Sequence, residues 1–387
     1  MPSPARRSGT GPAGAPTVSI RSIGTAVPPA VLQQGAMRDI LLAQPALGRL
    51  GRRLVGAAFD ASAIDTRHTV LDDLAGAPGD GAPLMHEAAT NTVLTPSTGA
   101  RNAAYVERAP ELCRLAATRA LASGDVAADD ITHVITVSCT GFAAPGPDLW
   151  LVRDLGLAAT TQRYHLGFMG CYGAFPALRM ARDVCRADPE AVVLVVCIEL
   201  CSLHLQVCDD PDAIVAASLF ADGAAAAVVT GRRAPAGAAV LDLDAFAPTV
   251  VQAGEAEMAW SIGDTGFDMV LSSYVPRIVE EHIAGALAPL LEAAGGTAGV
   301  DRWAVHPGGR SILDKVVQAL DLAPDALDGS RAVLREVGNL SSATILFVLK
   351  RILEGAAPGP APERVCAMAF GPGLTVETAL LTRRTAA

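Results

Sequence analysis

The chain has few aromatic residues, no basic stripe and no apolar run long enough to cross a bilayer. Aromatic side chains make up 4% of its 387 residues, so small aliphatic side chains must supply most of the core. The formal net charge is −10, from 30 basic and 40 acidic residues. This balance disfavours a nucleic-acid partner, because no basic surface is available to meet a phosphate backbone. The lack of a long apolar run predicts that the chain does not span a membrane.

Cysteine is too sparse for a disulfide framework. Eight cysteines in 387 residues lack the density of a small secreted scaffold, so we expect a reduced, cytoplasmic chain. Cys197, Cys201 and Cys208 match no zinc spacing, and we predict no metal site; in a strand, the first two would share one face. Residues 1–16 are rich in Pro, Gly, Ala, Ser and Arg without an apolar centre, which indicates a disordered tail rather than a secretory signal.

Small aliphatic residues dominate what is present, and hydrophobic residues make up 51% of the chain. This composition is typical of an α/β fold whose central strands are covered on both faces. The order of motifs also indicates an internal duplication, in which a helix that opens with a polar residue precedes a strand in each half. We predict halves at residues 17–235 and 236–387, joined near residues 231–237, where charge, Pro and Gly cluster.

Cys171 is the most informative residue of the chain. It lies in the segment Gly167–Gly173 (GFMGCYG), directly before the apolar-periodic run Ala174–Val184, so it stands near the start of a predicted buried helix. The helix dipole and the unpaired N–H groups there favour a thiolate, which is the nucleophile in covalent catalysis. The flanking glycines would let a substrate carbonyl approach the sulfur. An inert buried cysteine is the alternative, so the catalytic interpretation needs partners.

Two candidate partners lie downstream. His306 lies at the tip of a short apolar strand predicted from Trp303 onward, and a Pro-Gly-Gly turn follows it. Asn339 precedes the helical run Ala343–Leu353, much as Cys171 precedes its own helix. Taken alone, the first is consistent with a packed histidine and the second with an ordinary N-cap. Together the three residues supply a nucleophile, a base or cation and an amide donor, which is the set that acyl transfer through a thioester needs.

These residues lie in segments that resemble type III polyketide synthases, the chalcone synthase-like branch of the thiolase-fold enzymes. The resemblance runs from Thr17 to Thr382 and points to the bacterial branch. Its most specific segments are Gly167–Gly173, Leu219–Ala224 (LFADGA), His306–Gly309 (HPGG), Gly338–Ser342 (GNLSS) and Phe370–Glu377 (FGPGLTVE). Ketoacyl synthases that start fatty acid synthesis share the Cys-His-Asn set, but they follow the His with Gln-Ala-Asn where this chain has Pro-Gly-Gly.

The resemblance implies a thiolase-like five-layer αβαβα fold built from two similar halves, and a homodimer. The first half would carry Cys171, and the second His306 and Asn339. The implied enzyme is an acyltransferase of polyketide biosynthesis, in secondary metabolism. It loads an acyl-CoA starter on Cys171, condenses it iteratively with malonyl-CoA as carbon dioxide is lost, and cyclises the chain. His306, as a cationic neighbour of the thiolate, and Asn339 would stabilise the oxyanion and the enolate. Coenzyme A thioesters are the substrates, and no cofactor is implied.

The resemblance also assigns a substrate cavity. Phe220 corresponds to a gatekeeper between a coenzyme A tunnel and this cavity, and Phe267 to a second gatekeeper. Such an apolar wall disfavours a carboxylate and so favours decarboxylation of a malonyl group. The other assigned positions are Cys139, Thr140, Glu199, Cys201, His204 and Ser341, with Glu199 in the wall behind the nucleophile. Arg52 and Arg53 are the expected contacts at the coenzyme A entrance, although their spacing differs from that of the family and a solvated helix face is the alternative.

The sequence leaves the starter open. The patterns around Cys139 and His204, with small residues at Ala143 and Ala144, resemble synthases that convert fatty acyl starters to alkylpyrones or alkylresorcinols. A malonyl starter with a tetrahydroxynaphthalene-type product and an aromatic starter with a chalcone-type product are the alternatives. Remoter interpretations are a ketoacyl synthase III-like enzyme, a cysteine hydrolase and a catalytically silent binding protein. A preference for malonyl on a carrier protein would indicate the ketoacyl synthase, and release of free acid without extension would indicate the hydrolase. Failure to acylate Cys171 would indicate the binding protein.

Overall fold

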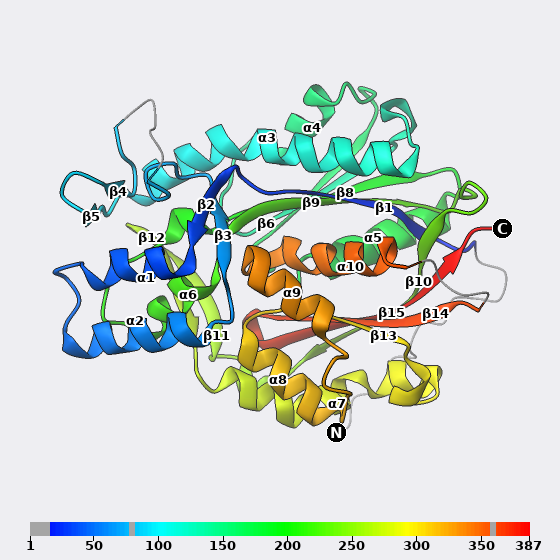
Figure 1. Ribbon diagram of the computed structural model, residues 1–387. Helices are drawn as coiled ribbons and strands as arrows, with labels where there is room; N and C mark the ends of the chain where they lie inside the picture. The colour runs from blue at the N-terminus through cyan, green and yellow to red at the C-terminus, as the bar shows by residue number, and fades with distance from the viewer. Residues whose placement is uncertain (1–15, 77–81, 357–360) are drawn as a thin grey trace.

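The computed structural model describes residues 16–76, 82–356 and 361–387. The disordered tail predicted at residues 1–16 therefore lies outside the described residues, except for its last position. The described chain folds into alternating layers of strands and helices, with a group of shorter elements at one side of these layers (Figure 1).

Among the described residues, nine strands form a mixed sheet in the order β13-β14-β15-β10-β1-β9-β8-β6-β7. The C-terminal part contains β13 (Arg302–Val305), β14 (Glu363–Gly371), β15 (Thr375–Thr385) and β10 (Ala239–Val250). The N-terminal part contains β1 (Ser19–Ala26), β9 (Asp222–Thr230), β8 (Val192–Leu200), β6 (His133–Ser138) and β7 (Gln162–Gly167). The two parts meet at a narrow seam between β1 and β10, where Ser19 pairs with Asp242 and Ile20 with Leu241.

The two parts of the sheet repeat one arrangement of strands. In the N-terminal part β6 pairs in parallel with β8, and β8 pairs antiparallel with β9. In the C-terminal part β13 pairs in parallel with β14, and β14 pairs antiparallel with β15. β8 and β9 are buried along their whole length, because layers of helices cover both of their faces. The predicted fold of two similar halves is confirmed.

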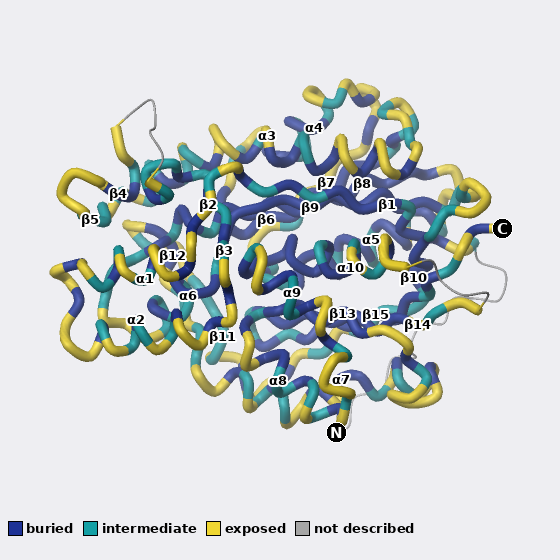
Figure 2. The backbone as a smooth tube through the Cα atoms, in the orientation of Figure 1, coloured by how far each residue is buried: buried dark blue, intermediate teal, exposed yellow. Residues whose placement is uncertain are grey.

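A pair of helices lies between the two parts of the sheet (Figure 1). α5 (Ala174–Ala187) precedes β8, and α10 (Thr344–Glu354) precedes β14. Side chains of both helices and of the strands that face them form one buried core, which includes Phe175, Val195 and Leu346. Figure 2 shows this central layer as a largely buried band. The central helices are therefore held from both sides by apolar contacts, which stabilises their ends as well.

Two outer layers of helices complete the fold. α3 (Thr98–Gly124) and α4 (Pro147–Asp154) pack on the outer face of the N-terminal strands. α7 (Val275–Ala294) and α8 (Arg310–Ala319) pack on the outer face of the C-terminal strands. The order is helix, strand, helix, strand, helix, as Figure 1 shows from top to bottom. This is the predicted five-layer αβαβα architecture.

The remaining elements lie mostly beside the layers. They are β2 (Ala30–Gln33), α1 (Gln34–Leu42), α2 (Arg49–Ala61), β3 (Thr66–Thr69), β4 (His86–Glu87), β5 (Thr92–Val93), α6 (Pro211–Leu219), β11 (Met258–Gly263), β12 (Gly266–Leu271) and α9 (Asp328–Val337). Short 3₁₀ turns are η1 (Ala128–Asp130), η2 (Cys201–His204), η3 (Gln252–Gly254), η4 (Thr297–Gly299), η5 (Ser341–Ala343) and η6 (Pro372–Leu374). The prediction that Cys197 and Cys201 share a strand face is wrong, because β8 ends at Leu200 and Cys201 begins η2.

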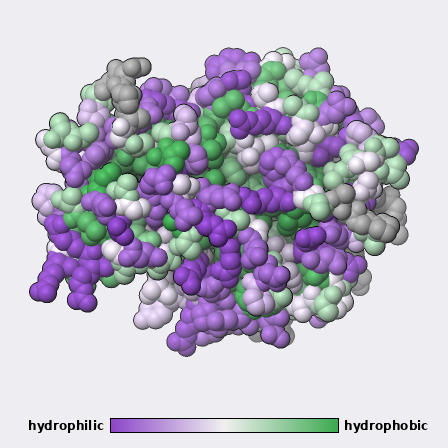
Figure 3. All heavy atoms as spheres, viewed as in Figure 1, coloured by the Kyte–Doolittle hydropathy of each residue, from purple (hydrophilic) through white to green (hydrophobic). Residues whose placement is uncertain are grey.

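The described residues contain no helix that is long and apolar enough to cross a membrane. All eight cysteines are free thiols. Within the same part of the chain, no three His, Cys, Asp or Glu side chains gather in a way that could hold a metal ion. Hydrophilic side chains cover much of the face seen in Figure 3, with hydrophobic side chains in scattered patches between them.

Candidate active site

Cys171 lies in the tight loop between β7 and α5, three residues before the first residue of α5. The loop depends on Gly170, whose φ of +80° belongs to the left-handed region that favours glycine. A Cβ atom at Gly170 would lie 2.4 Å from Cδ of Pro372 and 2.9 Å from the ring of Trp260. The glycine is therefore required for close packing against η6 and β11, and its expected role in the approach of a substrate stays a prediction.

His306 directly follows β13, as predicted, and is 1% exposed. Its backbone N–H donates to the carbonyl oxygen of Met368 over 2.8 Å, which continues the pairing of β13 with β14. Neither ring nitrogen has a hydrogen-bond partner among the described residues. The imidazole is thus a buried group whose polar atoms are available to a ligand in the site.

Asn339 lies just before η5 and α10, and its amide has a defined orientation. Its Oδ1 accepts from the backbone N–H of Ser341 over 2.9 Å and from the hydroxyl of Thr344 over 3.3 Å. Because a backbone N–H can only donate, the side-chain atom that faces Ser341 must be the amide oxygen. The amide nitrogen Nδ2 must therefore point the other way. Nδ2 donates weakly to the carbonyl oxygen of Gly308, over 3.3 Å, in the turn after His306. The amide donor and the histidine are therefore held beside the same turn.

Burial controls the charge of the nucleophile and of the histidine. Desolvation raises the pKa of Cys171 to about 12, although hydrogen bonding from Ser341 and Asn339 opposes the shift. Desolvation also lowers the pKa of His306 to about 3. These directions favour a neutral thiol beside a neutral imidazole in the free protein. Burial disfavours either charge when it forms alone, and the paired thiolate and cationic histidine expected from the sequence stay a prediction.

Two cavities meet at Cys171. The first runs beneath α1, α6 and β12, and its lining includes Leu32, Met37, Arg67, Leu74, Cys139, Thr140, Cys201, His204, Phe267 and Ser341. The second runs along the start of α8, and its lining includes Leu271, Val275, His306, Gly308, Gly309, Ser311 and Asn339. Cys171, Phe220, Trp260 and Met269 line both. Phe220 thus stands at the junction, where the resemblance placed a gatekeeper, whereas Phe267 belongs to the wall of the first cavity.

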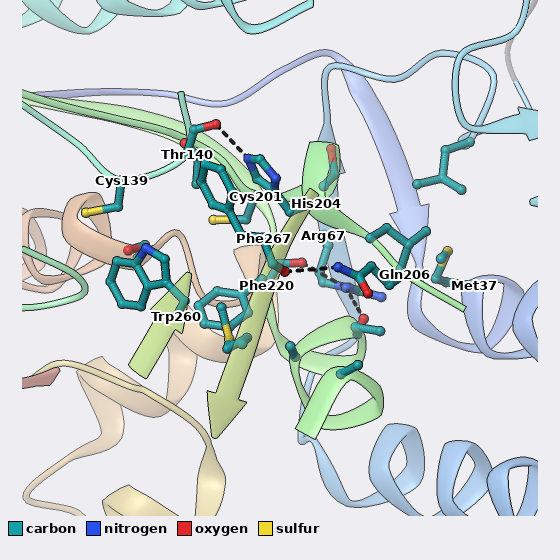
Figure 4. A pocket seen from close by; sticks show the side chains of 18 of the residues that line it. Met37, Arg67, Cys139, Thr140, Cys201, His204, Gln206, Phe220, Trp260 and Phe267 are labelled. Atoms are coloured by element: carbon teal, nitrogen blue, oxygen red, sulfur yellow. Dashed lines mark hydrogen bonds between the residues drawn. The ribbon is translucent and has the colours of Figure 1, made fainter. Parts of the chain in front are cut away.

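The first cavity is long and mostly apolar. In Figure 4, Cys139 and Trp260 lie at one end and Met37 at the other, with Cys201, His204, Phe267 and Phe220 between them. Its polar groups are few, and several are already engaged. The amide Nε2 of Gln206 donates to the carbonyl oxygen of Phe267 over 3.0 Å. A chain molecule with scattered polar groups fits such a lining better than a compact charged one.

Glu199 is fully buried behind the wall of the first cavity. Its carboxylate accepts hydrogen bonds from the backbone N–H of Cys139 over 3.0 Å, from the hydroxyl of Thr140 over 2.9 Å and from Ser342. Burial raises its pKa to about 7, and these hydrogen bonds oppose the shift. The residue holds the segment from Cys139 to Thr140 in place and is not part of the lining of either cavity.

The basic residues expected at the coenzyme A entrance do not face either cavity. Arg52 donates to the carbonyl oxygens of Gln44 over 2.9 Å, Leu47 over 3.2 Å and Leu42, so it ties the turn between α1 and α2. Arg53 is exposed on the same helix. No pattern in the sequence indicates that a guanidinium group lies among these carbonyl oxygens.

Arg67, Trp260 and Met269 line the first cavity and were not expected there. Arg67 is 3% exposed, and its Nη1 donates to the carbonyl oxygens of Ala217 and Phe220, each over 2.8 Å. Trp260 and Met269 come from the β11–β12 hairpin. The segment Gly263–Gly266 (GDTG) is a turn signature that could have revealed the hairpin, but not where its side chains would point.

Comparison with known proteins agrees with this geometry. The family described as chalcone and stilbene synthases matches its N-terminal domain to residues 6–233 and its C-terminal domain to residues 242–385. The fold and the site define a decarboxylating, acyl-transferring condensing enzyme. The chain belongs to the chalcone and stilbene synthase family and is a type III polyketide synthase.

Individual relatives span most of the chain. Bisdemethoxycurcumin synthase of Oryza sativa subsp. japonica is 35% identical over 74% of this chain and 74% of its own length. The 1,3,6,8-tetrahydroxynaphthalene synthase of Streptomyces coelicolor is 34% identical over 75% of this chain and 76% of its own. The crystal structure of PKS-I from the brown alga Ectocarpus siliculosus has a TM-score of 0.87 and 29% identity, covering 96% of this chain and 99% of that one.

Proposed function

We propose that this synthase takes a fatty acyl starter from coenzyme A and extends it with malonyl units to an alkylpyrone or alkylresorcinol. The observation that carries this proposal is the first cavity, whose mostly apolar lining includes Leu32, Met37 and Leu74, with Met37 at the end away from Cys139 and Trp260 in Figure 4. An alkyl chain bound there would leave water for apolar surface, which is favourable in proportion to the area removed from water.

Loading begins with the neutral pair of Cys171 and His306. The imidazole takes the thiol proton as the sulfur attacks the thioester carbon of the starter. The protonated His306 and Nδ2 of Asn339 then donate hydrogen bonds to the oxyanion of the tetrahedral intermediate. When the C–S bond to coenzyme A breaks, the departing thiolate takes the proton back from His306. The acyl group remains on Cys171, and both side chains are neutral again.

Extension uses the same two side chains as donors, with the neutral ring of His306 in the tautomer whose N–H faces the thioester oxygen. They hold the thioester oxygen of malonyl-CoA while its C–C bond to the carboxylate breaks and carbon dioxide leaves. The electron pair of that bond forms an enolate, whose oxygen the donors stabilise. The apolar side chain of Phe220 stands at the junction, where it disfavours the carboxylate before decarboxylation. The enolate carbon then attacks the acyl group on Cys171, and the sulfur leaves as a thiolate while the new C–C bond forms. The lengthened chain is now a coenzyme A thioester, and a repeat of loading returns it to Cys171 before the next extension.

The second cavity is the proposed path of the coenzyme A arm. Its lining includes Gly308, Gly309 and Ser311 at the start of α8, and Arg310 is exposed between them. Phosphate groups bind favourably near a helix N-terminus and an arginine. We therefore assign the entrance contact to Arg310 in place of Arg52, whose guanidinium group is engaged with backbone carbonyl oxygens.

A homodimer is proposed from the exposed end of the sheet. β7 is the last strand in the sheet order, and five of its six residues are exposed. The aromatic residues Tyr164, Phe168 and Phe142 at or near this strand are 38%, 39% and 43% exposed. An exposed edge strand with apolar neighbours readily pairs with a second copy. Light scattering should give twice the monomer mass; a monomer at micromolar concentration would contradict this proposal. The cytoplasmic location stays a prediction.

The experiment that tests the function is product analysis by mass spectrometry. The pure protein is incubated with malonyl-CoA and with octanoyl- to palmitoyl-CoA, 4-coumaroyl-CoA or no starter. We expect products that carry the fatty acyl chain plus two-carbon units, and an acylated Cys171 that is absent from Cys171→Ala. The similarity to tetrahydroxynaphthalene and bisdemethoxycurcumin synthases makes malonyl and aromatic starters the alternatives. Preference for 4-coumaroyl-CoA, or a product formed from malonyl-CoA alone, would overturn the fatty acyl assignment.

A further inference from the structure

His204 lines the first cavity, and one of its ring nitrogens has no hydrogen-bond partner among the described residues. Its Nε2 lies 2.7 Å from the carbonyl oxygen of Thr140. A carbonyl oxygen can only accept, so Nε2 must carry the proton. Burial lowers the pKa of His204 to about 4, so the ring is neutral near pH 7. The lone pair is therefore on Nδ1, and this atom can accept a hydrogen bond but cannot donate one.

The ring of His204 is held rigidly. It stacks on the ring of Phe267, with centroids 3.7 Å apart and planes 14° from parallel. Thr140, which accepts from Nε2, is fixed in turn. Its hydroxyl donates to Glu199 over 2.9 Å and accepts from the backbone N–H of Leu200 over 2.8 Å. The direction of the Nδ1 lone pair is thus set by β8 and by the wall behind it.

Nothing in the described part of the chain donates to Nδ1, although the atom is buried. The nearby hydroxyl of Thr140 and the amide of Gln206 donate elsewhere. A buried acceptor without a donor is unfavourable, so such an atom in a substrate cavity indicates a donor on the ligand. A fatty acyl thioester has no O–H or N–H group near its acyl end. A β-keto chain does, because its enol form carries a hydroxyl group.

We propose that Nδ1 of His204 accepts a hydrogen bond from an enol hydroxyl of the poly-β-keto chain on Cys171, and so positions that chain for ring closure. The inference rests on the proposed loading of Cys171. It makes the first cavity selective for the extended chain over the starter. No proton transfer is needed, and a neutral, weakly basic nitrogen is suited to this role.

The first test compares two substitutions of the ring. His204→Leu removes the acceptor and introduces an apolar side chain of similar size. His204→Asn instead places an amide oxygen near the position of Nδ1. The readout is the ratio of cyclised full-length product to early-released pyrone, each normalised to carbon dioxide released. We expect this ratio to fall about tenfold in His204→Leu, the scale of one lost hydrogen bond, and to recover in His204→Asn. An unchanged ratio in His204→Leu, or equal damage in both variants, would overturn the proposal.

The second test uses the unaltered protein, in case the variants fold poorly. The protein is prepared with ¹⁵N-labelled histidine and titrated with a 5-alkylresorcinol. The dimethyl ether of this compound, which lacks O–H groups, is the control. The Nδ1 resonance of His204 should shift with the resorcinol and not with the ether. Equal responses would contradict the inference even if loading of Cys171 is confirmed. If His204→Leu instead impairs loading of 4-coumaroyl-CoA alone, the acceptor binds the phenol of a starter and the proposal is wrong.

Discussion

Phe220 and Asn339 form an isolated parallel bridge between two segments that are far apart in the sequence. The backbone N–H of Asn339 donates to the carbonyl oxygen of Leu219, and that of Ala221 donates to the carbonyl oxygen of Asn339, each over 2.9 Å. The apolar group at the junction of the two cavities and the amide donor of the site are thus fixed to each other through the backbone. Substitution of either side chain should leave this bridge in place.

Truncation of Phe220 and of Phe267 should have different effects on activity, because Phe220 lines both cavities and Phe267 lines only the first. Phe220→Ala opens the junction to water, and we expect release of carbon dioxide from malonyl-CoA to fall roughly tenfold. Phe267→Ala alters the wall of the first cavity and should change the products more than the decarboxylation rate. Decarboxylation assays without a starter, followed by product analysis with one, measure both effects. Equal loss of decarboxylation in the two variants would refute the assignment of Phe220 to the junction.

The donors of the site can be tested without disturbing η5. Asn339→Asp keeps an oxygen that accepts from Ser341 but removes the Nδ2 donor. We expect this variant and His306→Ala each to lose about a hundredfold or more in malonyl decarboxylation, the usual scale for an oxyanion donor. Thermal unfolding serves as the control for folding. Undiminished carbon dioxide release from well-folded variants would remove both residues from the site.

The charge of Cys171 predicts how its alkylation depends on pH. Burial raises the thiol pKa to about 12, so the thiolate fraction is small at neutral pH and rises about tenfold per pH unit. Iodoacetamide should label Cys171 progressively faster from pH 6 to pH 9, as followed by peptide mass spectrometry. The same slope is expected for His306→Ala. A rate that is flat over this range in the unaltered protein would instead show a thiolate paired with a cationic histidine.

Glu199 should make the protein less stable as the pH rises. Its pKa is raised from 4.5 to about 7 in the folded state, so between these values the folded protein binds more protons than the unfolded chain. The free energy of unfolding must then fall with rising pH, by up to on the order of 3 kcal/mol, and level off above pH 7. Glu199→Gln should lack this part of the pH dependence, whereas the exposed Glu190→Gln should retain it. Parallel denaturation curves for Glu199→Gln and the unaltered protein at every pH would disprove the buried-carboxylate account.

The two arginines offer a matched test of the coenzyme A entrance. Arg310→Gln should raise KM for malonyl-CoA several-fold at unchanged kcat, because a phosphate contact contributes to binding and not to the reacting centre. Arg52→Gln should leave KM unchanged and lower the melting temperature, because its guanidinium group ties three carbonyl oxygens. A raised KM in Arg52→Gln and an unchanged KM in Arg310→Gln would instead assign the coenzyme A contact to α2.

The resemblance to thiolase-fold enzymes implied the layered fold, whereas the local sequence pattern indicated the three polar residues of the site. Cys171, His306 and Asn339 adjoin regular elements whose apolar periodicity is visible in the chain. The charge state of the first two could not be predicted in this way, because desolvation depends on which segments cover them. Trp260 and Met269 were missed for a similar reason. Only the folded position of the β11–β12 hairpin brings them to the cavity.

The placement of the nucleophile on the central layer has an evolutionary consequence. Cys171 and Asn339 are anchored by α5 and α10, which both parts of the sheet hold in place. Much of the first cavity is built instead from η2, α6 and the β11–β12 hairpin. Selection can therefore change the segments that shape the product without changing the residues that carry out the reaction. Drift in the peripheral segments can yield new polyketides while the condensing chemistry is inherited intact.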